Sequence, residues 1–235
     1  MVMATAVSGL AHPAFNGWRL FLLLLVLLSA PLAIAAMRAD FGQASTVSGF
    51  IALSVQVSVP WLYLAFAASA LARLFPGDAT RWLLRNRRYV GLAYAAGMAW
   101  QLVFILWLVT LHIDYYHEVA DNPYDLAEEL PGYVFLLAMV LTSFRSGREF
   151  LGSQRWNRLH TLGIYYLWAE TWSTYWWYAF YYDEPRALYF IYFWTGLLAW
   201  GLRVLDWQRT RAWSNSVPSP GVGVPDGVMP GGTAR

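Results

Sequence analysis

The sequence predicts an all-α polytopic membrane protein, a bundle of six transmembrane helices with both termini in the cytoplasm. Of its 235 residues, 58% are hydrophobic and 13% are charged, whereas soluble domains carry roughly 25% charged residues. Six apolar stretches approach the roughly 20 residues that a helix needs to cross a bilayer. Arginine gathers in alternate loops, which indicates the orientation by the positive-inside rule. Together these three observations favour an integral membrane protein.

The first span is a leucine-rich run. Leu20–Leu28, followed by Ala33-Ile34-Ala35, also fits a cleavable signal peptide. The region before it is long, however, and Arg19 is its sole charge, so a retained helix is favoured. Pro31 here and Pro60 in the second span each remove a backbone donor and should kink their helices. The six predicted spans are Trp18–Met37, Val47–Leu74, Tyr89–His112, Pro131–Phe144, Trp156–Tyr181 and Arg186–Trp207.

The later spans are bounded by charge and by proline. The third follows Arg87-Arg88, and the fourth begins at Pro131, is the shortest and should extend at both ends. The fifth and sixth contain dense aromatic runs, Trp172–Tyr182 and Tyr189–Trp194. Such runs are typical of membrane interfaces and of helix packing. They could also line a site for a planar ligand.

Arginine sets the expected topology. Three arginine-rich regions should face the cytoplasm: the loop between spans two and three, the loop between spans four and five, and the end after span six. The loop between spans three and four has acidic residues and no arginine, so it should face the periplasm. Its acidic residues are Asp114, Glu118, Asp121, Asp125, Glu128 and Glu129.

The prediction divides the chain into a cytoplasmic N-terminal segment (1–17), a six-helix domain (18–211) and a disordered, Pro/Gly-rich cytoplasmic tail (212–235). The sequence contains no cysteine, which excludes disulfides, iron–sulfur clusters and thiol catalysis. It has no basic block suited to nucleic acid. The expected partners are therefore the lipid bilayer and other membrane or periplasmic subunits.

Polar residues inside the apolar spans are the first candidates for chemistry. A charge at the depth of Glu170 costs at least ~2.5–3.5 kcal/mol, so this carboxyl is either neutral and hydrogen-bonded for packing, or a proton, quinone or counterion site. Gln101, also at mid-span, is a candidate partner for Glu170. Met98, one turn from Gln101, could ligate heme through its thioether, although packing is the commoner use of such a methionine.

Histidines are the second set of candidates. His160 lies a turn inside the fifth span, where imidazole can ligate a metal, relay a proton or bond an interfacial neighbour. His112 and His117 lie near carboxylates at the outer end of the third span, a combination that suits Zn, Fe or Cu. Their spacing does not place them on one helical face, so a metal site there is a weak hypothesis beside a solvated cap.

Three segments resemble the ferric reductase-like transmembrane domain, in its bacterial heme-binding-subunit branch. They are Arg87-Arg88-Tyr89-Val90-Gly91-Leu92, Leu141-Thr142-Ser143 with Leu151-Gly152, and Trp156-Asn157-Arg158-Leu159-His160-Thr161-Leu162. The resemblance implies a bacterial inner membrane, b-type heme between histidines of the third and fifth helices, and electron transfer from a flavin or quinone to an outer acceptor such as a periplasmic reductase. His160 matches the histidine that opens the family's fifth helix.

The chain departs from the family at the remaining ligands. The third-helix histidine falls at or near Gln101, and a further fifth-helix histidine falls near Ser173. Heme b on His160 alone, on His160 with Met98, or completed by another subunit stays open, as does a quinone beside Glu170 and Gln101. The alternative is a heme-free structural or accessory subunit in which Gln101 and Glu170 fill the heme space as a bonded pair. A proton path through Glu170 is a third possibility.

Overall fold

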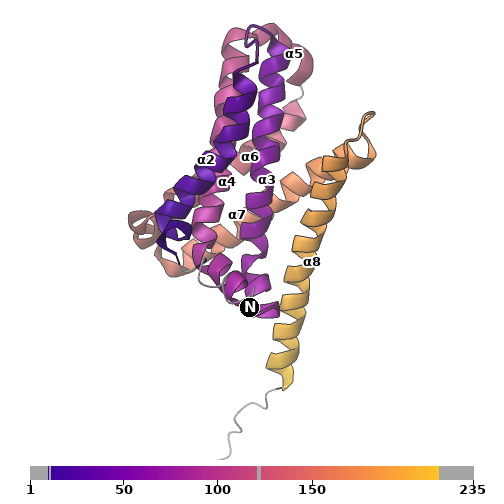
Figure 1. The fold of residues 1–235 in the computed structure, drawn as a ribbon. Coiled ribbons are helices and arrows are strands. Elements are labelled where there is room, and N and C mark those ends of the chain that lie inside the picture. Colours follow the sequence, from indigo (N-terminus) through magenta and orange to yellow (C-terminus); the bar gives the residue numbers. More distant parts are fainter. Residues whose placement is uncertain (1–9, 11, 121–122, 217–235) are drawn as a thin grey trace, which may run out of the picture.

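The chain is almost entirely helical in the computed structural model, which describes residues 10, 12–120 and 123–216 (Figure 1). The side chains of 119–129 and 213–216 lie outside that description. The first of these ranges includes the acidic residues Asp121, Asp125, Glu128 and Glu129. Most of the predicted tail, from 217 on, does as well. The elements are η1 (Pro13–Phe15), α2 (Gly17–Ala36), α3 (Ala44–Leu74), α4 (Asp78–Leu111), α5 (Ile113–Ala120), α6 (Pro123–Leu141), α7 (Arg145–Phe180) and α8 (Ala187–Ser216).

Four of these helices are long and apolar enough to cross a membrane: α2, α3, α4 and the part of α8 up to Ala212. A fifth span results if Leu130–Leu141 and α7, which meet at an angle of 111°, are counted as one bent pair. An all-helical chain with several membrane-spanning helices is therefore confirmed, while the number six stays a prediction. α7 fails the test alone because tyrosine, tryptophan and polar side chains stand where the other spans are aliphatic.

Helices replace much of the expected loop structure. α4 begins at Asp78 rather than at Tyr89, and α7 begins at Arg145 rather than at Trp156. The arginines expected in those loops thus extend the helices beyond their apolar parts. Within α7, Gly152 has φ 72° and ψ 162°, a conformation that glycine adopts without the strain a side chain would bring. It separates a short interfacial helix from the span proper.

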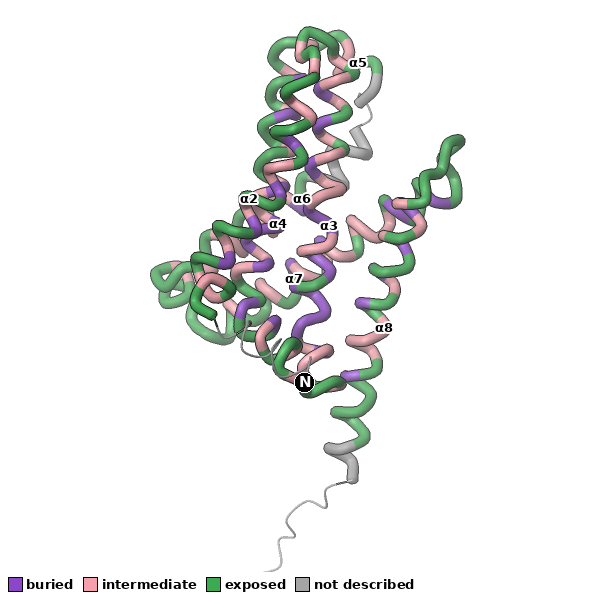
Figure 2. Tube along the Cα trace, in the orientation of Figure 1, coloured by how far each residue is buried: buried purple, intermediate pink, exposed green. Residues whose placement is uncertain are grey.

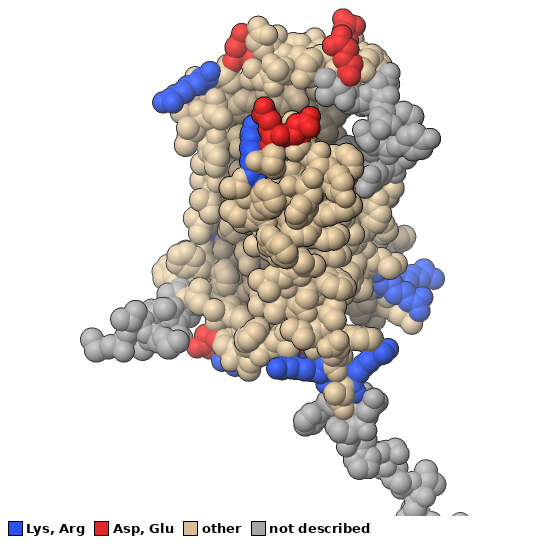
Figure 3. Space-filling model, turned by 90° about the vertical axis from the view of Figure 1, so that its right-hand side faces the viewer, with Lys and Arg blue, Asp and Glu red and all other residues tan. Residues whose placement is uncertain are grey.

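Charged side chains concentrate at the two ends of the bundle and leave an uncharged band between them (Figure 3). One end, called here the arginine-rich end, contains the last turn of α3, the first turns of α4 and α7, and the last turns of α8. The opposite end contains α5 and the turn between α7 and α8. This distribution matches the one that the sequence predicts, and the side of the membrane on which each end lies stays a prediction.

α3 lies at the centre of the bundle and packs against α2, α4, α7 and α8. Buried residues follow it along its length (Figure 2). Its contact with α4 is close because Gly97 has no side chain: a Cβ at this position would overlap the Oγ of Ser58 and meet a methyl group of Leu28. Small residues at a helix interface let two backbones approach in this way.

Pro60 explains one bond between α3 and α8. Proline has no N–H, so the carbonyl of Gln56, one turn earlier, loses its helical donor. The hydroxyl of Tyr192 on α8 donates to that carbonyl at 2.7 Å. An unsatisfied carbonyl in an apolar medium costs several kcal/mol, and the tyrosine removes that cost while joining the two helices.

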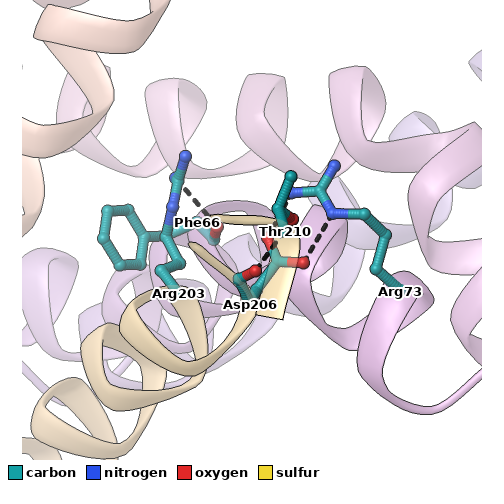
Figure 4. A network of polar contacts seen from close by, with 5 residues as sticks. All are labelled: Phe66, Arg73, Arg203, Asp206 and Thr210. Carbon is teal, nitrogen blue, oxygen red and sulfur yellow. Dashed lines mark hydrogen bonds and ion pairs between the residues drawn. The ribbon is translucent and has the colours of Figure 1, made fainter. Parts of the chain in front are cut away.

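A charged network joins the same two helices at the arginine-rich end (Figure 4). Asp206 of α8 is only 7% exposed and forms a two-bond ion pair with Arg73 at the end of α3. Arg203, one turn earlier on α8, donates to the carbonyl of Phe66 at 3.2 Å. Its guanidinium lies 4.5 Å from the ring centroids of both Phe66 and Tyr165, so it also brings α7 into contact with this network.

We predict that Tyr192→Phe destabilises the protein by about 0.6–1.7 kcal/mol, the range measured for hydrogen bonds between membrane helices. In a Pro60→Ala background the residue at 60 regains its N–H and can bond to Gln56, so the same substitution should cost only a few tenths. Reversible unfolding in mixed micelles measures the double-mutant cycle. Equal costs in the two backgrounds would contradict the account, and Tyr182→Phe, at an exposed position, is the control.

We predict that Asp206→Asn lowers the free energy of unfolding by about 1–2 kcal/mol, because it leaves Arg73 and Arg203 without their shared counterion. Removal of one partner of a fully buried pair costs 3–5 kcal/mol, but the Arg73 side chain is 60% exposed and water takes up part of that loss. Asp78→Asn, which breaks an exposed pair with Arg81, should change stability by less than about 0.5 kcal/mol. Similar effects of the two substitutions would refute this role of Asp206.

Candidate functional site

A cavity of about 750 Å³ opens at the arginine-rich end, between α3, α4, α6 and α7. Aliphatic side chains line it further along the helices, and arginines line it near the end of the bundle. The aliphatic residues are Leu62, Leu92, Leu136, Val140, Ile164 and Leu167, and the arginines are Arg87, Arg88, Arg145 and Arg148. This volume is within the range of about 300–1,000 Å³ that is usual for small-molecule sites.

The cavity follows from how its helices pack. α4 packs on α2 and α3, whereas α7 packs on α6 and α8, so the two helices form opposite walls. The wall on α4 has little side-chain volume because it includes Gly91 and Ala95, and a Cβ at Gly91 would meet open space. On the other side the chain turns between α6 and α7 and again at Gly152, which also lines the cavity.

His160 lies in the α7 wall of this cavity. Its ring stacks on Trp156, one turn earlier, with centroids 4.2 Å apart, and its Nε2 lies 3.0 Å from the hydroxyl of Thr142 on α6. That hydroxyl has one proton, which it donates to the carbonyl of Ala138 at 2.7 Å. It must therefore accept from the imidazole, and Nε2 of His160 carries a proton. Trp156 adds a bond to α6 by donating to the carbonyl of Thr142 at 2.8 Å.

The other predicted cofactor residues do not line the cavity. Met98 packs in the core formed by α3, α4, α7 and α8. Gln101 has a buried Oε1 without a hydrogen-bond partner, so this atom does not make the expected bond to Glu170. The carboxylate of Glu170 lies against Gly132 of α6, where any Cβ would overlap it.

The polar residues that follow Glu170 on α7 bond to its backbone carbonyl. The hydroxyls of Ser173 and Thr174 donate to the backbone carbonyl of Glu170, at 2.8 and 2.9 Å. Serine and threonine often bond back along a helix in this way. The mid-membrane position of Glu170 stays a prediction, and the bonding of the residues around it could not be derived from the sequence.

His112 and His117 lie at the opposite end of the bundle from His160. The Nε2 of His112 lies 3.3 Å from the carbonyl of Phe41, and His117 packs edge-on against Tyr116. Among the residues whose side chains the structure describes, no three His, Asp or Glu residues group as metal ligands. The metal site at His112 and His117 stays a prediction.

The cavity has room for a planar cofactor, but its donor set does not fit b-type heme. The α4 residues that line the cavity are Arg87, Arg88, Gly91, Leu92, Tyr94 and Ala95, and none of them has an imidazole or a thioether. Met139 also lines the cavity, but its sulfur packs against Gly163 on the His160 side, so the two cannot bind opposite faces of a ring. The Nε2 of His160 lies 3.0 Å from the hydroxyl of Thr142, so this nitrogen could bind a metal only after that contact is broken. We therefore derive no step through heme.

Sequence reasoning identified His160 but not the groups that set its environment. Thr142 and Trp156 were noted only as parts of the family-like segments, and their spacing to His160 could have shown a contact once α6 and α7 were paired. Arg87 was assigned to a loop. Comparisons of the chain with protein-family models, with curated proteins and with solved structures find no match.

We predict that His160 is neutral with its proton on Nε2. Solid-state ¹⁵N NMR of the whole protein in bilayers reports the protonation of each ring nitrogen, and the chain has only four histidines to assign. Thr142→Val should remove the acceptor and shift the Nε2 signal of His160, whereas Thr110→Val, whose hydroxyl bonds within α4, should not. An unprotonated Nε2 in the unaltered protein would contradict the hydrogen-bond assignment.

Proposed function

We propose that the protein is a heme-free membrane subunit with the layout of a ferric reductase-like domain, and that it serves as an accessory or scaffold subunit of a larger complex in a bacterial inner membrane. The observation behind this proposal is the wall that faces His160. The α4 residues of the cavity lining include no histidine or methionine, and the Nε2 of His160 is already in hydrogen-bond contact with Thr142.

The proposal extends to topology and partners. The arginine-rich end faces the cytoplasm, as the positive-inside rule requires, and both termini lie on that side. The opposite end exposes a group of aromatic side chains at the end of α7: Trp176, Trp177, Tyr181 and Tyr182 are 40–57% exposed. Aromatics at this position anchor a helix at the interface. They also offer a contact for a periplasmic or membrane partner.

The second candidate is electron transfer through a quinone beside His160. The cavity size and the stacked Trp156–His160 pair in its wall support it. A quinone needs no axial ligand, and a ring in the cavity could take hydrogen bonds from polar residues of the lining. The sequence predicts a quinone beside Glu170 and Gln101. Neither residue lines the cavity, so we place the quinone beside His160 instead.

We predict a featureless visible spectrum for the protein purified from cells supplied with heme, and less than about 0.1 heme per chain by the pyridine hemochrome assay. The spectrum is recorded oxidised and after dithionite. A Soret band that shifts on reduction, is lost in His160→Ala and is kept in His112→Ala would overturn the heme-free proposal. Organic extraction of the same sample, followed by mass spectrometry, tests the quinone alternative: a stoichiometric quinone would support electron transfer instead.

A further inference from the structure

The cavity beside His160 has a strongly unbalanced charge. Four arginines and one glutamate, Glu149, line it, which leaves a formal charge of +3. Glu149 pairs with Arg145 at 2.8 Å, and both of these side chains are mostly exposed. The protein thus provides little compensation for the other three guanidinium groups, and an anionic ligand would supply it.

The three remaining arginines are positioned in two ways. Arg88 lies 5.6–5.7 Å from the ring centroids of Trp18, Tyr89 and Phe144, and Arg148 lies 4.9 Å from that of Trp156. Stacking on aromatic faces holds a guanidinium while leaving its N–H edge available. Arg87 forms no ion pair with any side chain that the structure describes.

Arg87 also lies among like charges. It is near enough to Arg73 and Arg203 to be repelled by both, and Asp206, the carboxylate of that group, is already paired with Arg73. Arg87 is exposed to solvent, which screens this repulsion, and an anion bound beside it would reduce the repulsion further. Because Arg87 lines the cavity, the cavity is where that negative group would lie.

The chemistry of the lining selects the ligand. A phosphate, like a carboxylate, accepts two parallel N–H bonds from a guanidinium. The aliphatic part of the cavity requires an apolar group as well, since an unfilled apolar surface loses its packing contacts. Inorganic phosphate or a soluble phosphate ester would fill only the arginine-lined part. A phosphate attached to acyl chains would fill both, and basic pockets on the cytoplasmic side of membrane helices favour such lipids.

We propose that this cavity binds an acidic phospholipid of the inner leaflet, with its phosphate between Arg87 and Arg148 and one acyl chain along Leu136, Val140 and Ile164. The inference rests on the proposed function in two respects: heme in the cavity would leave no room for the lipid, and the cytoplasmic orientation of the arginine-rich end places the lipid in the inner leaflet. It extends that function by giving the cavity a ligand of defined chemistry. The protein becomes a membrane subunit whose arginine-rich end is held together by a bound lipid.

The test is native mass spectrometry of the full-length protein in detergent after delipidation, with added phosphatidylglycerol or phosphatidylcholine. We expect one phosphatidylglycerol per chain, bound at least about tenfold more tightly than phosphatidylcholine. Arg87→Gln should weaken it by about five- to tenfold. Arg85→Gln, on the same helix but outside the cavity lining, should leave binding unchanged. Equal binding of the two lipids, or equal effects of the two variants, would overturn the proposal.

A second pair of variants tests the apolar part. Gly91→Phe places a ring into open space in the cavity and should abolish stoichiometric lipid binding without changing any charge. Gly201→Phe on α8, which also meets open space but lies outside the lining, should not. If 10 mM inorganic phosphate or glycerol phosphate displaces the lipid, the site is for a free phosphate and the proposal fails. A heme spectrum from the same sample would instead refute the heme-free function, which keeps the two failures distinguishable.

Discussion

The absence of water from the apolar layer constrains the structure more than any single contact, because every polar group there needs a partner within the protein. α3 shows how the constraint is met. Pro60 frees the carbonyl of Gln56, and Tyr192 of α8 takes its place as donor. At the arginine-rich end, Arg203 and Asp206 bond to α3 again. α8 is therefore held at several depths, and α7, which packs on α8, is held with it.

The cavity follows from this arrangement. α7 packs on α6 and α8. α4 packs on α2 and α3, which it meets closely at Gly97. The two walls are held apart by their separate partners, and the small residues on α4 do not fill the space between them. In the family that the sequence resembles, heme occupies the space between the third and fifth helices. In this protein the cavity between α4 and α7 is lined by one histidine, in contact with Thr142, and by four arginines.

The parts of the structure that depend on apolar length could be predicted from the sequence, and those that depend on helix rotation could not. The bounds of α2 and α3 follow from their aliphatic runs and differ from the expected ones by at most a few residues. α4 and α7 were expected to be shorter, since the arginines before them read as loop although arginine favours helices. Gln101 and Glu170 were both expected near the middle of their spans, but position along a helix does not fix which way a side chain faces, so whether they pair could not be derived. His160 was identified because its segment combines a conspicuous motif with a rare residue.

The central claim is that the space between α4 and α7 holds an anionic amphiphile rather than heme. A cryo-EM map of the protein in nanodiscs made from native lipids tests it most directly. The account predicts a compact headgroup density between Arg87 and Arg148 that continues as a narrow chain beside Ile164, with the His160 ring still bonded to Thr142. A flat density with a strong central peak, bonded to His160 and turning it away from Thr142, would contradict the account.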